Sequence, residues 1–130
     1  MASNNASVRE LRAALKAQSD RLRANAASAI EAAAQELAAA IRARAPIRKG
    51  NLAKSVQAIS LGAGKWRVQA GGDLTTKEVR KGSGKPYDYA RATEFGTTDE
   101  EAHPFFYNTF RAKKGGIKSR VEKAARDALD

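Results

Sequence analysis

The hydrophobic positions between residues 7 and 45 recur with the period of an α-helix. Spacings of three, four and seven dominate among the larger apolar residues, and an eleven-residue spacing also recurs; these residues are Val8, Leu11, Leu15, Leu22, Ile30, Leu37 and Ile41. Such spacing keeps one apolar stripe on one face of a nearly straight helix. Alanine fills much of the rest, and neither Gly nor Pro interrupts the segment. The pattern predicts one long helix over residues 7–45.

Both ends of this helix have sequence signals. Ser7 and Glu10 have the spacing of a capping box, in which the Ser hydroxyl accepts from an amide of the first turn and the Glu side chain reaches back. Arg42 and Arg44 suit the last turn because cations are favourable at a helix C-terminus. Pro46 stops the helix because it cannot continue the hydrogen-bond ladder.

The length of this helix exceeds the size of a compact domain. Thirty-nine residues span about 58 Å at the rise of an α-helix, whereas a compact chain of this length is roughly 36 Å across. The helix must therefore project beyond the domain or break, and Ser19, Asp20 and Asn25 are candidate break points. We expect residues 1–20 to be a flexible or helical extension.

The middle of the chain changes to short, partly alternating segments. Residues 46–55 indicate a loop leading into a short turn. Residues 56–61 and 66–70 alternate as strands, and the Gly-Ala-Gly sequence at 62–64 between them favours a hairpin. Residues 73–86 are polar and charged, which predicts an exposed mobile loop.

The last third predicts helices around an aromatic-rich core segment. Residues 87–95 fit either a strand or a helical turn, and 96–102 form an acidic turn. Pro104 suits the first turn of a helix that covers three aromatic residues, Phe105, Phe106 and Phe110. A Gly-Gly pair at 115–116 weakens or kinks that helix, and 117–129 form a final amphipathic helix.

These elements predict one α+β domain over residues 1–130. A long N-terminal helix, a small antiparallel sheet of two to four strands and one or more C-terminal helices would pack together. Of the hydrophobic residues, 28 are alanines, so few large side chains remain for a core. At roughly 1.5–3 kcal/mol per buried large side chain, the margin over chain entropy is small. We therefore expect a partner subunit, or a segment that orders on assembly.

Charge is unevenly distributed around the net value of +10. Residues 46–91 carry ten basic and three acidic side chains, whereas residues 92–110 carry no basic and four acidic ones, namely Glu94, Asp99, Glu100 and Glu101. A basic body attracts nucleic acid. A basic body with an acidic patch also attracts copies of itself head to tail. A solvated surface of mixed charge is the third interpretation.

The composition excludes several classes of protein and site. No apolar run is long enough to span a membrane, and the N-terminus does not have the pattern of a signal peptide. The chain contains no Cys, which removes disulfides and thiolate metal sites and fits a reducing cytoplasm. We expect no metal site and no cofactor.

Catalytic sets are absent from the sequence. The single histidine, His103, precedes a proline in a turn, a context typical of a capping or surface residue. The segment 81–85 (KGSGK) resembles a phosphate-binding loop but does not have the required spacing between Gly and Lys. We therefore expect no enzyme and no catalytic residue.

A small basic nucleic-acid-binding protein is the alternative to a structural role. Trp66, Tyr87 and Tyr89 occur among Lys and Arg residues, and aromatic side chains among basic groups can stack on bases. The segment matches no RNA-recognition, OB-fold or helix-turn-helix signature. The simpler interpretation is that these aromatic residues supply core volume.

Three ordered segments together resemble a protein family. Residues 45–56 read APIRKGNLAKSV directly after the long helix, 89–97 read YARATEFGT, and 102–106 read AHPFF before a C-terminal helix. This order is similar to that of the neck proteins of long-tailed bacteriophages, known as tail-completion, head–tail joining or minor tail proteins. The resemblance covers about residues 25–125. Lys49 replaces a frequent Thr, and 107–110 (YNTF) depart from the usual sequence.

The resemblance implies a structural role for the residues of its motifs. They are Pro46, Gly50, Leu52, Ser55, Tyr89, Glu94, Phe95, Gly96, Pro104 and Phe105. Gly50 would permit the turn into the sheet, and the apolar members would form the core with Val56. Glu94 would accept backbone amides, pair with a neighbouring subunit or form a salt bridge within the chain.

The resemblance also implies function and partners. It implies a virion protein that forms a ring, of six copies or alternatively twelve, around the DNA channel at the head–tail interface. The partners would be head-closure, tail-terminator or tail-tube proteins, with non-specific contact to channel DNA and no membrane. Assembly would take place in the bacterial cytoplasm.

Overall fold

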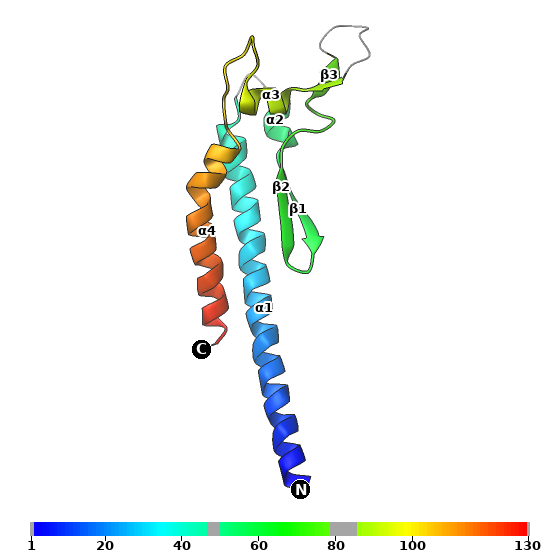
Figure 1. Ribbon diagram of the computed structural model, residues 1–130, viewed down its shortest axis with the longest axis vertical. Coiled ribbons are helices and arrows are strands. Elements are labelled where there is room, and N and C mark those ends of the chain that lie inside the picture. The colour runs from blue at the N-terminus through cyan, green and yellow to red at the C-terminus, as the bar shows by residue number, and fades with distance from the viewer. Residues whose placement is uncertain (1, 47–49, 79–85, 130) are drawn as a thin grey trace.

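The computed structural model describes residues 2–46, 50–78 and 86–129, and it shows an elongated molecule built along one helix (Figure 1). Helix α1 (Ala2–Arg44) is continuous, so it does not break at the candidate points. It ends two residues before Pro46, as predicted. It begins five residues before Ser7, so the predicted capping box is wrong. Because Ser7 lies within the helix, its position cannot be the cap.

The predicted hairpin is confirmed to within one residue at each strand end. Strands β1 (Gln57–Gly62) and β2 (Lys65–Gln69) are antiparallel, with Gln57 opposite Gln69 and Ser60 opposite Trp66. The turn has three consecutive residues with positive φ, including Gly62 at 80° and Gly64 at 74°. Because L side chains rarely adopt this conformation, glycine at these positions fixes where the hairpin turns.

A second antiparallel pair closes the segment that was predicted as a loop. Strand β3 (Thr76–Glu78) pairs with β4 (Pro86–Asp88), and helix α3 (Tyr89–Phe95) follows at once. The prediction of a loop over 73–86 therefore holds at 73–75 and is wrong at 76–78 and at Pro86, where the strands lie; residues 79–85 lie outside the described residues. Residues 87–95 were predicted as either a strand or a helical turn. Both are present, because residues 87–88 belong to β4 and residues 89–95 form α3. Within the part of the chain that the structure describes, the strands form two separate two-stranded pairs.

Helix α2 (Gly50–Ser55) replaces the predicted short turn. Gly50 begins this helix without a positive φ, so the turn assigned to Gly50 does not require glycine. The buried Ser55 hydroxyl donates to the Leu52 carbonyl at 2.6 Å and accepts from the Gly71 amide at 2.9 Å. Ser55 thereby attaches α2 to the chain that leaves β2.

The C-terminal part of the chain forms one helix, α4 (Tyr107–Asp127), which continues through Gly115 and Gly116. The predicted division at these glycines is wrong, because α4 packs along α1 and this packing offsets the low helix propensity of glycine. Pro104 lies three residues before α4 and not in its first turn, so Phe105 and Phe106 precede the helix.

We expect Gly115→Ala to raise the free energy of unfolding by about 0.5–1 kcal/mol, because alanine loses less chain entropy on entering a helix. Gly115 is exposed, has no positive φ, and a Cβ there would meet no atom within 4 Å. Urea denaturation of the variant and the parent chain measures the change. An unchanged or lower midpoint would contradict a continuous helix at this position.

The core lies where α1 meets α2, α3 and the start of α4. Its buried residues are Leu37, Ala38, Ile41, Ala45, Leu52, Val56, Ala90 and Phe105. The predictions for Leu52, Val56 and Phe105 are confirmed, and Tyr89 packs at the margin of the cluster. The prediction for Phe95 is wrong: its side chain is 64% exposed, although the three residues before it in α3 are buried.

Candidate assembly surfaces

The N-terminal half of α1 projects beyond both α4 and the hairpin (Figure 1). We call residues 7–23 the N-terminal arm. Val8, Leu11 and Leu15 are 46%, 60% and 56% exposed, and their spacing of three and four places them on one face. We call them the apolar row. It is the same stripe that predicted the long helix, and within the described chain it remains largely exposed.

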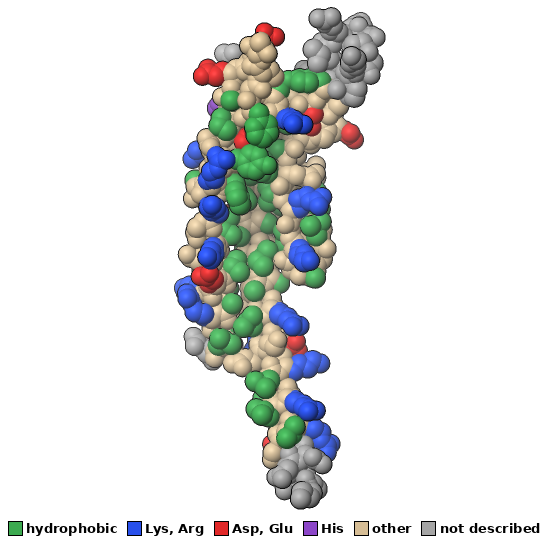
Figure 2. Space-filling view, viewed as in Figure 1, with side chains coloured by type: hydrophobic (Ala, Val, Ile, Leu, Met, Phe, Trp, Pro, Cys, Tyr) green, Lys and Arg blue, Asp and Glu red, His purple; other side chains and the backbone are tan. Residues whose placement is uncertain are grey.

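A row of cations runs beside the apolar row. Arg9, Arg12 and Lys16 each follow an apolar-row residue by one position, so they repeat its spacing along the adjacent face. We call them the basic row. Figure 2 shows hydrophobic and basic side chains side by side along the arm. These cations were not among the predicted site residues, although their repeated spacing is visible in the sequence.

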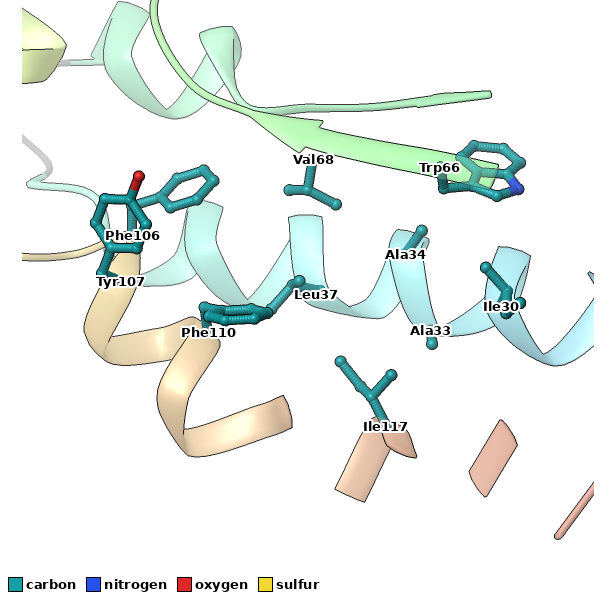
Figure 3. A pocket seen from close by; sticks show the side chains of 10 residues that line it. All are labelled: Ile30, Ala33, Ala34, Leu37, Trp66, Val68, Phe106, Tyr107, Phe110 and Ile117. Carbon is teal, nitrogen blue, oxygen red and sulfur yellow. The ribbon is translucent and has the colours of Figure 1, made fainter. Parts of the chain in front are cut away.

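An apolar groove runs along α1 between α4 and β2 (Figure 3). It has a volume of about 330 Å³. Trp66 and Val68 of β2 form one wall, and Phe110 and Ile117 of α4 form the other. Between the walls the groove is lined by α1, with Ile30, Ala33, Ala34 and Leu37. The groove leaves apolar surface open beside residues 30–37 of α1.

An aromatic patch lies at the end of the molecule opposite the arm. It consists of Phe95, Tyr107 and Phe110, which are 64%, 46% and 40% exposed. The rings of Phe95 and Tyr107 have centroids 6.2 Å apart, within the range of a favourable ring pair. The exposure of Phe95 that contradicts the predicted core thus belongs to a larger apolar surface.

The buried carboxylate of Glu94 fixes the start of α4, which carries part of the aromatic patch. The Glu94 side chain is buried, and its two carboxylate oxygens accept hydrogen bonds from the backbone amides of Phe106 and Tyr107 at 2.9 and 3.0 Å. These amides belong to the start of α4, where free N–H groups and the helix dipole favour a negative charge. Of the three roles considered for Glu94, the structure shows the acceptance of backbone amides.

An acidic loop follows Phe95 directly and borders the patch. It contains Asp99, Glu100 and Glu101. The Thr97 hydroxyl accepts from the Asp99 and Glu100 amides at 3.3 and 3.0 Å, and the Thr97 amide donates to the Glu100 carbonyl at 2.8 Å. These bonds hold three carboxylates in one short turn beside exposed rings.

Gly96 permits the turn from α3 into the acidic loop. Its φ of 78° and ψ of 169° lie in a region that only glycine readily adopts. A Cβ at this position would lie 2.8 Å from the Ala102 amide nitrogen. The resemblance included Gly96 among its motif residues. The positive φ and the short Cβ distance explain why this position requires glycine.

Asp88 joins the β3–β4 pair to α3. Its carboxylate accepts from the Gly72 amide at 3.0 Å, the Thr75 hydroxyl at 2.6 Å and the Ala90 amide at 2.9 Å. Partial burial acts to raise the pKa of Asp88, but the hydrogen bonds from Gly72, Thr75 and Ala90 together outweigh it and lower this pKa.

We expect the contribution of Asp88 to stability to be complete above the pKa of about 3.9 that an unfolded Asp has. Because the pKa is lower in the folded chain, this contribution falls away as the pH drops below that value toward the folded pKa. Urea midpoints of the parent chain and Asp88→Asn, measured from pH 6 to 2.5, test this. The difference between them should shrink below pH 4, and a constant difference would contradict it.

His103 has a structural position. Its amide donates to the Thr93 carbonyl at 2.7 Å, and its Nε2 lies 3.3 Å from the Arg44 carbonyl oxygen at the end of α1.

No helix in the described part of the chain is long and apolar enough to cross a membrane. Among residues 2–46, 50–78 and 86–129, no group of three acidic or histidine side chains could hold a metal ion. The KGSGK segment lies outside the described residues.

The aromatic residues among the basic groups do not form one row for stacking bases. Trp66 points into the apolar groove (Figure 3). Tyr89 packs against the core cluster, and Tyr87 lies half-buried on β4. At Trp66 and Tyr89 the structure therefore favours the simpler interpretation, in which these rings supply packing.

The fold and these surfaces define an elongated α+β protein with a small core and apolar surface exposed along its length. A comparison with protein families matches residues 9–96 to the family described as "Bacteriophage HK97-gp10, putative tail-component". The chain belongs to this family of phage tail components, which is not an enzyme family. No curated protein and no solved structure gives a significant match. The matched region includes the first resembling segment and all but the last residue of the second, and the third lies beyond it.

Proposed function

We propose that this tail component is a structural subunit of a homomeric ring that joins or completes the tail at the head–tail interface. The ring would surround the DNA channel, with six copies favoured, as the resemblance implies, and twelve as the alternative. Its neighbours would be head-closure, tail-terminator or tail-tube proteins. Family membership supports a place in the virion, and assembly would take place in the host cytoplasm.

The observation that carries this proposal is the exposed apolar surface on a protein with a small core. The apolar row, the groove and the aromatic patch lie largely open within the described chain. Contiguous exposed apolar surface of this kind marks interaction sites on soluble proteins. Association of copies would remove it from water and supply the burial that the core does not provide.

Light scattering after size exclusion tests the proposal by giving absolute mass. For the full chain alone, at low and moderate salt, we expect a mass near six or twelve times 13.9 kDa. Incorporation into purified phage tails that do not contain the chain, seen by electron microscopy, would support the same role. A chain that stays monomeric and does not bind tail or neck proteins would overturn it.

A basic nucleic-acid-binding protein is the second candidate, because the net charge is +10 and the basic row is exposed. Binding that neutralises Z phosphates gives a slope of about −0.9Z in log K against log salt. Titration with duplex DNA measures this slope. Tight binding with a steep slope, together with a monomeric mass, would favour this candidate, whereas weak binding would leave channel contact as an incidental role.

A further inference from the structure

We infer that the N-terminal arm of one copy docks on the aromatic patch of the next copy, with the basic row against the acidic loop. This contact rests on the proposed ring, in which these two surfaces would meet. The occupant of the patch is a second copy of this chain.

The contact must form between copies because of where the two surfaces lie. The arm projects from one end of the molecule, and the aromatic patch and acidic loop lie toward the other end (Figure 1). Helix α1 is continuous from Ala2 to Arg44, so the arm cannot fold back to reach the patch of its own chain. Both surfaces therefore remain open until another molecule covers them.

The two surfaces match in polarity. The arm presents an apolar row and a basic row side by side along one helix (Figure 2). The opposite end presents exposed rings that continue directly into a loop with three carboxylates. When the apolar row lies on the rings, the basic row can lie along the carboxylates. Such pairing of opposite charges around an apolar contact guides partners and fixes their register.

The charges favour this end of the molecule over the other apolar surfaces. Residues 7–23 carry five basic and two acidic side chains, whereas residues 92–110 carry four acidic and none that is basic. Arg91 and Arg111 lie at the two ends of the acidic segment, so residues 91–111 still carry a net charge of −2.

Two other occupants of the apolar surfaces would bring like charges together. Two arms packed on each other in parallel would place their basic rows close to one another. An arm in the groove would lie beside Lys114, which follows Phe110 by one turn on α4, whereas Lys65 and Arg67 point to the face of β2 opposite the wall residues Trp66 and Val68.

A contact between two different surfaces at opposite ends is heterologous. Each copy then has one free arm and one free patch, so addition continues until the chain of copies closes. This geometry gives a ring where the rotation between neighbours closes, and it uses every arm and every patch once. The inference therefore gives the proposed ring a defined interface.

Because the chain contains no Cys, single engineered cysteines report this contact cleanly. Leu11→Cys and Tyr107→Cys variants are mixed under mild oxidation, and disulfide-linked dimers are followed by non-reducing electrophoresis. Leu61→Cys replaces Tyr107→Cys in the control, since Leu61 is similarly exposed at 50% but lies on the hairpin. We expect the mixed arm–patch pair to cross-link at least tenfold faster than the control pair.

Charge reversal tests the register of the same contact. Arg12→Glu, in the basic row, should slow arm–patch cross-linking about fivefold, and Asp99→Lys on the patch partner should restore much of the rate. Arg21→Glu makes the same change of charge on the arm outside the basic row and should have little effect. Equal effects of the two reversals would overturn the assigned register.

The outcomes separate this inference from the proposed ring. Equal rates for the patch and control pairs, or dominant cross-links between two Leu11→Cys arms, would overturn the arm–patch contact. If light scattering still gives a ring mass in that case, the ring stands and only the assigned interface is wrong. If the chain also stays monomeric and does not bind tails, the proposed function is wrong as well.

Discussion

Replacing Glu94 by Ala should lower the free energy of unfolding by about 3 kcal/mol, because two amides lose a charged acceptor. The carboxylate is 6% exposed and bonds the Phe106 and Tyr107 amides at the start of α4. Without this carboxylate, the two amides lose their Glu94 acceptor next to Phe105, a buried core residue. The aromatic patch should lose its fixed geometry at the same time. Urea denaturation measures the loss of stability, and near-ultraviolet circular dichroism reports the rings.

Two further variants show whether the effect comes from those hydrogen bonds. Glu101→Ala removes the same charge from an exposed position and should change stability by less than about 0.5 kcal/mol. Glu94→Gln keeps the shape but offers only one accepting oxygen, so its loss should be intermediate. If Glu94→Ala and Glu101→Ala were equally mild, Glu94 would not be the acceptor that holds α4.

Gly96→Ala should cost about 2–4 kcal/mol, because a backbone conformation reserved for glycine and a steric clash act together. The φ of 78° would strain any L side chain, and the new Cβ would lie 2.8 Å from the Ala102 amide nitrogen and 3.1 Å from the Glu100 carbonyl oxygen. Both neighbours are backbone atoms, so relief requires the acidic loop to move. Urea denaturation measures the loss.

Two glycines separate the contributions to this effect. Gly72 has a φ of 101° but open space around its Cβ position, so Gly72→Ala should suffer only the conformational strain. Gly50 has neither a positive φ nor a neighbour within 4 Å, so Gly50→Ala should be neutral or slightly stabilising. A loss at Gly96 no larger than that at Gly50 would contradict the geometry of the acidic loop.

Sequence patterns predicted the elements that depend on neighbours along the chain. The long helix follows from the spacing of its apolar residues and from Pro46, and the hairpin follows from two alternating segments around Gly62 and Gly64. The same reasoning was wrong where packing outweighs propensity. Gly115 and Gly116 lie inside α4, because the contact of α4 with α1 offsets their helix propensity.

The candidate surfaces were predictable only in part. The apolar row was visible in the sequence as a stripe, and the excess length of the helix predicted that it projects or breaks. The aromatic patch was not predicted, because an aromatic residue in a family motif is expected in the core and Phe95 was assigned there. Its ring is exposed although the three residues before it in α3 are buried.

The long helix, the hairpin, the small core and the opposite charges of the arm and the acidic loop were predictable from the sequence, because each follows from local periodicity or composition. The capping of α4 by Glu94 and the shared exposed surface of Phe95 and Tyr107 became visible only in the folded chain. These features join residues twelve or more positions apart, so they depend on how α3 and α4 meet, which no local pattern specifies.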